Sequence, residues 1–177
     1  MNLPNKLTMG RMIAVPFFIA AYLLGYYPVA LILFICASIT DFFDGKIARD
    51  RGLVTNFGKI MDPLADKILV YSALCLFIES DLIAGWMLII ILAREFVVAG
   101  MRTVAASEGR VLAAGMSGKI KTVLQMFAVI AYLFALSVPK ISATVTLAAN
   151  ILFWASLVMT VYSGVEYVWK NRDIFSM

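Results

Sequence analysis

Six apolar stretches constrain this chain more than any other feature of its sequence. Each is near the length of about 20 residues that a helix needs to cross a bilayer, and polar or turn-forming segments separate them. With 63% hydrophobic and only 15% charged residues among 177, the chain is too apolar for a soluble domain. We therefore expect an all-α integral membrane protein, a single domain over residues 1–177 with six transmembrane helices. The expected helices cover residues 11–26, 28–49, 60–79, 83–105, 115–137 and 143–169.

The N-terminal residues and the distribution of positive charge predict how the chain lies in the membrane. Residues 2–11 mix polar and apolar positions. We interpret them as a short interfacial amphipathic segment rather than a signal peptide, because the stretches that follow are themselves spans. Of the 15 Lys and Arg residues, only Lys140 falls on the opposite side of the membrane from the N-terminus. Cytoplasmic loops carry the excess of Lys and Arg, so both termini are expected in the cytoplasm.

Cysteine and histidine usage narrows the chemistry. Cys36 and Cys75 both fall inside apolar stretches, so we interpret them as packing residues rather than a disulfide. The chain has no histidine, which leaves carboxylates for any proton transfer. Nothing in the sequence is typical of a module that reads nucleic acid, and a net charge of +4 in an apolar chain points to cytoplasmic loops and lipid headgroups.

Four aspartates stand in this apolar sequence near the end of the second stretch and the start of the third. On a helix, Asp41 and Asp44 share a face, and so do Asp62 and Asp66. Carboxylates gathered near a membrane repel one another unless a cation compensates them. Oxygen ligands without Cys or His favour Mg²⁺ or Mn²⁺, and a paired-metal site suits displacement at phosphorus. The sequence therefore predicts a two-metal site that acts on a phosphate ester.

The spacing around these aspartates is Asp-x2-Asp-Gly-x2-Ala-Arg-x8-Gly-x3-Asp-x3-Asp. It resembles the signature of the CDP-alcohol phosphatidyltransferase family. The alternative, a helix end rich in solvated acids, does not explain the apolar residues between the acids. Every fixed position of the signature is filled, by Asp41, Asp44, Gly45, Ala48, Arg49, Gly58, Asp62 and Asp66.

The resemblance implies roles for these residues. Asp41, Asp44 and Asp62 would hold a first Mg²⁺ or Mn²⁺ ion, Asp62 would also contact a second, and Asp66 would complete the second site and act as the catalytic base. A metal beside Asp66 would also lower the pKa of the alcohol that it must deprotonate. The resemblance assigns nucleotide binding to Asp41, Asp44, Gly45, Ala48, Arg49, Thr55 and Gly58.

Three of these positions have a further physical reading. Without a Cβ, Gly45 lets a nucleotide approach the backbone, although tight helix packing is an alternative. Arg49 offers a forked donor to a diphosphate. Thr55 falls where the family has a small hydroxyl contact to the nucleotide, and a role without nucleotide contact stays open for it.

A second cluster of charge, carried by the fourth and fifth stretches, predicts a site for a phosphorylated acceptor. Cations at membrane depth are expensive and mark a substrate path or an ion pair. Arg94 could simply pair with Glu95, and the two lysines could be anchors at the membrane surface. The spacings Arg-Glu-x6-Arg and Gly-Lys-x-Lys-Thr, the latter over residues 118–122, also resemble the branch of the family that uses glycerol phosphate. The candidate acceptor residues are Arg94, Arg102, Arg110, Lys119 and Lys121.

The resemblance, together with the basic cluster, implies an enzyme that transfers the phosphatidyl group from CDP-diacylglycerol to the hydroxyl of sn-glycerol 3-phosphate and releases CMP. The resemblance also implies a homodimer in a bacterial plasma membrane, with the site on the cytoplasmic side. Serine, inositol phosphate and phosphatidylglycerol are alternative acceptors, although serine leaves the basic cluster unexplained. A divalent-cation transporter is an alternative of another class, because intramembrane aspartates would serve it too.

Overall fold

The computed structural model describes residues 3–50, 56–113 and 115–176 of this chain, and for 3–7, 41–50, 56–60, 62, 63, 66, 175 and 176 it describes the backbone only. Helices make up nearly all of this part. Glycines with positive φ follow two of them, Gly25 (φ 77°) and Gly109 (φ 74°), a backbone conformation that ends helices. The elements are α1 (Leu3–Leu23), α2 (Tyr27–Asp50), α3 (Asn56–Glu79), α4 (Gly85–Ser107), α5 (Met116–Ser137), η1 (Pro139–Ile141), α6 (Ser142–Lys170) and η2 (Arg172–Ser176).

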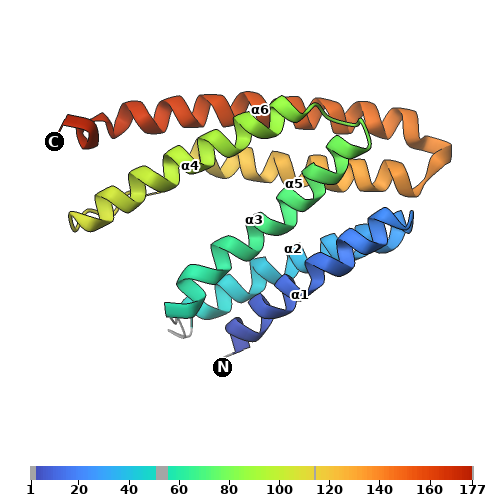
Figure 1. The fold of residues 1–177 in the computed structure, drawn as a ribbon, viewed down its shortest axis with the longest axis horizontal. Coiled ribbons are helices and arrows are strands. Elements are labelled where there is room, and N and C mark those ends of the chain that lie inside the picture. The colour runs from blue at the N-terminus through green and yellow to red at the C-terminus, as the bar shows by residue number, and fades with distance from the viewer. Residues whose placement is uncertain (1–2, 51–55, 114, 177) are drawn as a thin grey trace.

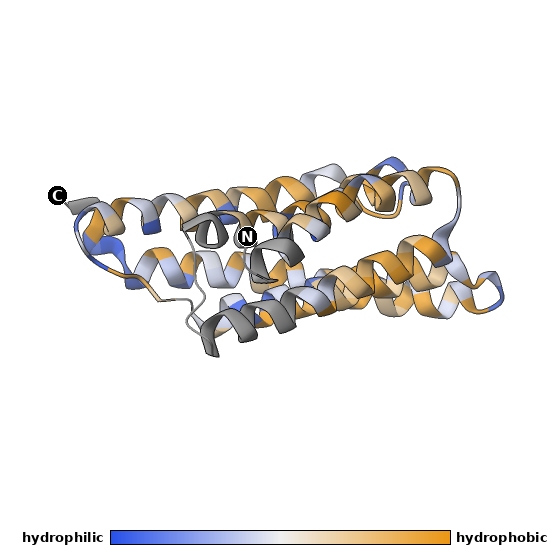
Figure 2. Ribbon diagram, turned by 90° about the horizontal axis from the view of Figure 1, so that it is seen from below, coloured by the Kyte–Doolittle hydropathy of each residue, from blue (hydrophilic) through white to orange (hydrophobic). Residues whose placement is uncertain are grey.

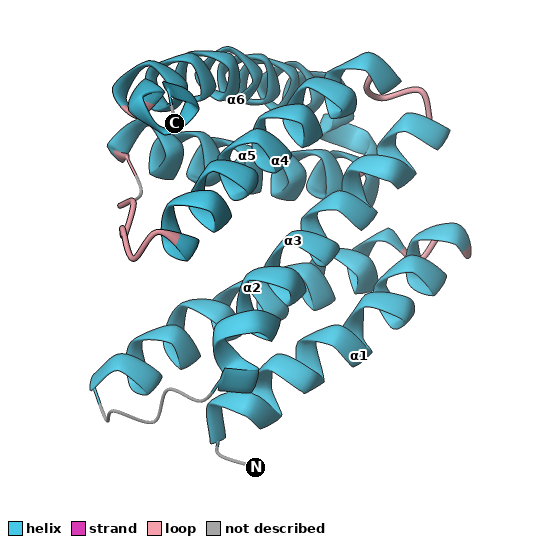
Figure 3. Cartoon of the chain, turned by 60° about the vertical axis from the view of Figure 1, so that its left-hand side comes forward, coloured by secondary structure: helices cyan, strands magenta, loops and turns pink. Residues whose placement is uncertain are grey.

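The helices form two groups: α1, α2 and α3 run obliquely to the long axis of the molecule, and α5 and α6 run along it (Figure 1). In the first, α1 packs against both α2 and α3; in the second, α6 packs against both α4 and α5. Contacts between α2 and α5 join the groups. Successive helices alternate in direction, so the end of α2, the start of α3, the end of α4, the start of α5 and both termini lie toward one end of the molecule (Figures 1 and 3). We call this the charged end.

The apolar core lies between these groups, toward the other end. Its largest buried side chains are aromatic and come from both groups of helices. Phe77 and Tyr132 have ring centroids 5.1 Å apart, within the range that favours aromatic pairs. The Tyr132 hydroxyl donates to Asn150 Oδ1 at 2.6 Å, which satisfies a polar group that packing would otherwise bury unpaired. This core holds α3, α5 and α6 together away from the candidate site.

Apolar residues predominate along most of the helices (orange in Figure 2), and many of them are exposed. Large side chains such as Phe96 and Ile89 are exposed on α4, and Ile151 is exposed on α6. Exposed large apolar side chains are this numerous on few soluble proteins. Two helices within the described residues, Met116–Ser137 and Pro139–Lys170, are long and apolar enough to cross a membrane. These are the features of a membrane protein.

Other predicted spans meet this length and composition test less well. The apolar parts of α1 and α2, Thr8–Leu23 and Tyr27–Thr40, are shorter than a full span. Helix α4 carries Arg94 and Glu95 near its middle, which interrupts its apolar run. All six predicted helices are therefore present. Two of them are long and apolar enough to cross a membrane.

Two helices, α1 and α3, begin earlier in the structure than the sequence predicts. The segment predicted at residues 2–11 is helical where the structure describes it, and it continues without a break into the first span, because α1 begins at Leu3. Pro4 falls in the first turn, where a proline costs no hydrogen bond, and Gly10 alone does not end a helix. The third helix also begins earlier than the predicted residue 60, since α3 begins at Asn56 and runs through Pro63.

Candidate active site

Both halves of the aspartate signature lie at the charged end, on consecutive antiparallel helices. The first half occupies the last turns of α2, and the second half occupies the first turns of α3. Both helix ends lie toward the same end of the molecule (Figure 3). The sequence predicts the aspartates near the end of the second helix and the start of the third, and the backbone confirms this placement.

The helical backbone gives the signature a shared face within each helix. Asp41 and Asp44 are three residues apart in α2, and Asp62 and Asp66 are four apart in α3, so each pair lies on one side of its helix. Gly45, Ala48 and Arg49 follow in α2, and Gly58 precedes in α3. Thr55 lies outside the described residues, as do the signature side chains from Asp41 to Asp66.

The donor set at these positions suits a hard divalent cation. It consists of carboxylates alone, in a chain without histidine. Elsewhere, among the side chains that the structure describes, no three Asp, Glu or Cys residues lie together in a way that could hold a metal ion. The four aspartates therefore stay the predicted metal ligands.

A cluster of four charged side chains lies beside the signature, and we call it the Glu95 cluster: Lys67, Arg94, Glu95 and Lys121. Glu95 Oε2 accepts from Lys67 Nζ at 2.7 Å, and its Oε1 accepts from Arg94 NH1 at 2.9 Å and from Lys121 Nζ at 2.5 Å. The carboxylate side chain is only 11% exposed and that of Lys121 only 5%. One buried anion thus gathers cations from α3, α4 and α5.

Lys67 connects this cluster to the aspartates. It follows Asp66 directly in α3, and its ammonium reaches α4 to pair with Glu95. The cluster has three formal positive charges against one negative charge, so a surplus of positive charge lies next to the last position of the signature. Such a surplus attracts a phosphate group.

Arg94 is held by more than its neighbour Glu95. Its Nε donates to Ser163 Oγ at 3.2 Å, on α6, while NH1 donates to Glu95. The pairing with Glu95 that the sequence left as an alternative is thus present, and it exists together with contacts to another helix. Next to Arg94, a small polar hollow of about 30 Å³ is lined by Ser117, Glu166 and Lys170 among others, room for about one water molecule.

The other candidate acceptor residues do not join the Glu95 cluster. Arg102 Nε donates to the Tyr167 hydroxyl at 3.1 Å, and its guanidinium also lies 5.5 Å from the centre of that ring. Arg110 pairs with Asp173 at 2.6 Å, with both side chains largely in solvent. This hydrogen bond lowers the pKa of the Asp173 carboxyl. Lys119 is exposed on α5, and Lys121 alone of the two lysines is buried.

Sequence reasoning missed the contribution of α6 and of Lys67. Helix α6 supplies Ser163 to Arg94 and Tyr167 to Arg102. The only sequence signal for the contribution of α6 was the helical spacing of four polar residues, Ser156, Thr160, Ser163 and Tyr167. All four are buried. Lys67 had a clearer signal, because it directly follows an aspartate of the signature in an otherwise apolar helix.

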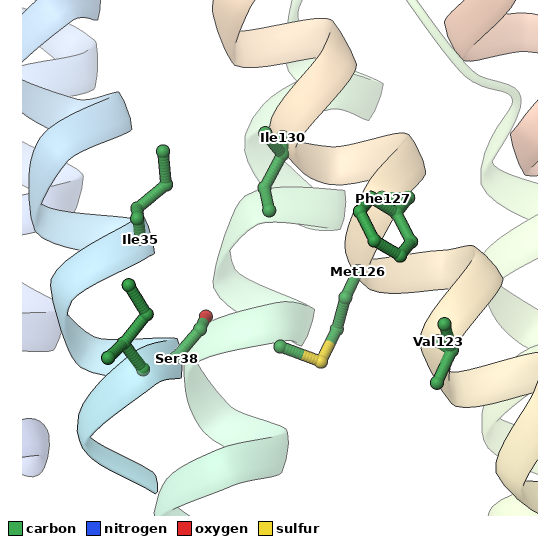
Figure 4. Close-up of a pocket in the computed structure, with 7 residues that line it drawn as sticks. Ile35, Ser38, Val123, Met126, Phe127 and Ile130 are labelled. Carbon is green, nitrogen blue, oxygen red and sulfur yellow. The ribbon is translucent and has the colours of Figure 1, made fainter. Parts of the chain in front are cut away.

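An apolar hollow of about 310 Å³ lies between α2 and α5 (Figure 4). In that view Ile35 and Ser38 on α2 face Met126, Phe127 and Ile130 on α5, and Val123 lies farther along α5. Ser38 is three residues before Asp41, so the hollow lies one helical turn from the signature. An apolar surface that close to the aspartates is a place where the hydrocarbon part of a lipid could lie.

Comparison with known proteins gives a family match over most of the chain. The family model for CDP-alcohol phosphatidyltransferase matches residues 1–162. The chain belongs to the CDP-alcohol phosphatidyltransferase family. The matched range includes both halves of the signature and all the candidate acceptor residues, and it ends one residue before Ser163.

Several curated relatives within the CDP-alcohol phosphatidyltransferase family share nearly the whole length. A CDP-diacylglycerol–glycerol-3-phosphate 3-phosphatidyltransferase from Bacillus subtilis (strain 168) is 44% identical over 97% of this chain and 96% of its own. A protein of the same name from Rickettsia felis is 36% identical, over 98% of this chain and 97% of its own. A probable phosphatidylglycerophosphate synthase from Mycobacterium tuberculosis is 40% identical, over 98% and 83%. Nothing in these comparisons supports the divalent-cation transporter.

Proposed function

We propose that this protein transfers the phosphatidyl group from CDP-diacylglycerol to sn-glycerol 3-phosphate, giving phosphatidylglycerophosphate and CMP. Full-length similarity to relatives named for this reaction supports the proposal. The single structural observation that supports it most directly is the ion pair between Lys67 and Glu95. It joins a cluster with surplus positive charge to the helix that carries Asp62 and Asp66.

The four aspartates are proposed to hold the metal ions. Asp41, Asp44 and Asp62 would bind one Mg²⁺ or Mn²⁺ ion, and Asp62 and Asp66 a second. When bound, the ions would stabilise negative charge on the oxygens around the reacting phosphorus. The carboxylate-only donor set and its placement on two facing helix ends support this assignment.

In the proposed reaction Asp66 accepts the proton of the acceptor's primary hydroxyl. The oxygen forms a bond to the phosphorus that carries diacylglycerol, and the bond from that phosphorus to CMP breaks, so that CMP leaves with the electron pair. Arg49 would donate hydrogen bonds to the leaving phosphate, as a guanidinium suits. Gly45, Ala48, Thr55 and Gly58 complete the proposed nucleotide site with the two aspartates of α2.

The acceptor's phosphate is proposed to bind at the Glu95 cluster through Arg94 and Lys121. A phosphate monoester carries about −1.5 to −2 charges at neutral pH. The cluster's three cations and single anion leave a surplus of two positive charges, which matches such a group. Serine has no phosphate and would leave this surplus unmatched, whereas inositol phosphate carries the same group and needs the experiment below. Arg102, Arg110 and Lys119 are proposed as outer cations that attract the acceptor toward the cluster.

The donor's diacylglycerol is proposed to stay in the bilayer, with an acyl chain along the apolar hollow between α2 and α5. The proposed enzyme is a single domain over residues 1–177, with six helices across the plasma membrane of a bacterium and both termini in the cytoplasm. The distribution of Lys and Arg along the sequence supports this orientation. A homodimer is the proposed assembly.

The experiment that tests this function is release of CMP by purified protein in mixed micelles with CDP-diacylglycerol. Glycerol 3-phosphate, serine, inositol phosphate and phosphatidylglycerol are compared as acceptors, each with Mg²⁺, with Mn²⁺ and with EDTA. We expect release with glycerol 3-phosphate, its loss in EDTA and its return when metal is added. Release with inositol phosphate alone would contradict the proposed acceptor, and release with none would contradict the reaction.

A further inference from the structure

Two glycines from different helices make room for the side chain of Arg94. A Cβ added to Gly118 of α5 would lie 2.9 Å from Arg94 NH2, and one added to Gly164 of α6 would lie 3.0 Å from Arg94 Cγ. Both distances are shorter than nearly all real Cβ contacts. Among the other glycines whose surroundings the structure describes, none has a neighbour closer than 3.5 Å. Arg94 therefore occupies a slot bounded by the backbones of α5 and α6.

The contacts of the guanidinium fix its orientation in this slot. Nε donates to Ser163 on α6 and NH1 donates to Glu95 on α4, and the third nitrogen, NH2, lies against Gly118 on α5. Because the guanidinium is planar, two directed hydrogen bonds determine where NH2 points. The side chain is 13% exposed, so little solvent competes for these contacts.

We propose that Gly118 is a positioning residue for acceptor recognition: its missing Cβ leaves the place in which Arg94 NH2 lies, ready to donate to the acceptor's phosphate. This inference rests on the proposed function. It gives a physical reason for the glycine in the Gly-Lys-x-Lys-Thr sequence, which the proposed reaction leaves unexplained. Lys121 follows one turn later on α5 and binds the same carboxylate as Arg94, so one helix supplies both the slot and the second cation.

The alternative role for Gly118 is to let two helices pack closely. Gly118 and Gly164 differ in which part of the Arg94 side chain each of them meets. Gly164 meets Cγ of Arg94, close to the backbone of α4, so a methyl group there would push α4 and α6 apart. Gly118 meets the far end of a flexible side chain, so a methyl group there would displace the guanidinium and leave the helices in place. Gly118→Ala is therefore the informative substitution.

The test compares Gly118→Ala, Arg94→Lys, the double variant and the control Gly100→Ala. Gly100 is exposed on α4 and an added Cβ would meet nothing within 4 Å. The KM values for both substrates and kcat are measured by CMP release, and the thermal unfolding midpoint is measured in detergent. We expect Gly118→Ala to raise the KM for glycerol 3-phosphate about tenfold or more, since misplacement by about 1 Å can cost about 100-fold. The KM of Gly118→Ala for CDP-diacylglycerol should stay unchanged, and so should the KM values of Gly100→Ala for both substrates.

The double variant distinguishes an effect of Gly118→Ala that acts through Arg94 from an effect on helix packing in general. A lysine at position 94 has no terminal NH2 group to displace, so Gly118→Ala should add no further increase in the acceptor KM in the Arg94→Lys background. An unchanged acceptor KM in Gly118→Ala would overturn the proposal, and so would equal effects of this substitution in both backgrounds.

Failure of the proposed function is recognised separately. If the wild-type protein releases no CMP with glycerol 3-phosphate, the function is wrong, and acceptor recognition by the slot is wrong with it. The unfolding midpoint then still reports on the slot itself. Displacement of the guanidinium lowers the midpoint of Gly118→Ala only when Arg94 is present, whereas the higher helix propensity of alanine alone would raise it in both backgrounds.

Discussion

Glu95 is the residue on which the proposed acceptor site depends most. It is the shared anion of three cations, and Lys121 beside it is almost completely buried. Removing one partner of a buried ion pair leaves an uncompensated charge, which costs more than the pair itself contributes. The side chain therefore keeps in place cations that would otherwise repel one another.

We expect Glu95→Gln to lower the thermal unfolding midpoint by about 5 °C or more, because loss of a buried counter-ion costs about 3–5 kcal/mol. The acceptor KM should rise in the same variant, since Lys67, Arg94 and Lys121 lose their common partner. Glu108→Gln, an exposed glutamate after α4, is the matched control and should change neither quantity. A Glu95→Gln variant as stable as the wild type would contradict the role of this carboxylate.

Asp66 is the residue whose proposed role is chemical. The Asp66→Asn variant keeps the size of the side chain and loses the ability to accept a proton, so turnover should fall by at least about 100-fold, the lower range for a general base. The variant should still fold, judged by gel filtration and its unfolding midpoint. Asp81→Asn, in the turn at the other end of the molecule, is the control and should keep full activity. Retained turnover in Asp66→Asn would exclude it as the base.

Arg94 and Arg110 separate the buried part of the acceptor site from its outer part. Arg94→Ala should raise the acceptor KM far more than Arg110→Ala, because Arg110 lies in solvent and is already paired with Asp173. The stability that the ion pair between Arg110 and Asp173 contributes is fully present above the pKa that Asp173 has in the unfolded chain. It is lost as the pH falls through the lower pKa of Asp173 in the folded protein. Equal KM changes in the two variants would show that the Glu95 cluster has no special place in binding. The acceptor KM of each variant is measured from Michaelis–Menten curves with glycerol 3-phosphate.

At the scale of helices, α2 and α5 have a role of their own because they enclose the apolar hollow beside the signature. Val123→Trp on α5 would fill part of it, so the KM for a long-chain CDP-diacylglycerol should rise several-fold. A donor with short acyl chains should be affected less, and the KM for glycerol 3-phosphate should not change. Val158→Trp, at an exposed position of α6 outside the hollow, is the control. Equal sensitivity for both donors would exclude the hollow as an acyl-chain site.

The helices and the signature were predictable from the sequence for different physical reasons. Apolar stretches of the right length determine helices in lipid, where every backbone polar group needs an internal partner. The signature was recognisable because its eight residues have fixed spacing on two consecutive helices. The start of α3 was predicted less well, because a proline such as Pro63 is compatible with either the first turn or the interior of a membrane helix.

The contacts between distant helices were not predictable in the same way. Ser163 and Gly164 are small residues in an apolar helix, and nothing local marks them as neighbours of Arg94, which is 69 residues from Ser163. Arg102 and Arg110 were placed with Arg94 because they follow it in sequence. Their partners, Tyr167 and Asp173, come from the C-terminal part of the chain, and only the packing of α4 against α6 and η2 brings them together.

For the whole molecule, the arrangement of charge predicts one orientation in the membrane. In a background with Cys36 and Cys75 replaced by alanine, the thiol of Lys140→Cys should react with a membrane-impermeant maleimide from outside intact cells. The thiol of Glu108→Cys should react only after the cells are opened, because position 108 lies at the charged end. Labelling in the reverse order would contradict the proposed cytoplasmic site.

The link between Asp66 and the Glu95 cluster through Lys67 has a consequence for the order of events during turnover. The donor's nucleotide and the acceptor's phosphate would have separate but adjoining places, so both substrates can be present at once and the phosphatidyl group can pass directly between them. No covalent lipid–enzyme intermediate is then required. Initial-rate plots at several fixed acceptor concentrations should intersect rather than run parallel, and radioactive CMP should not exchange into CDP-diacylglycerol when glycerol phosphates are absent.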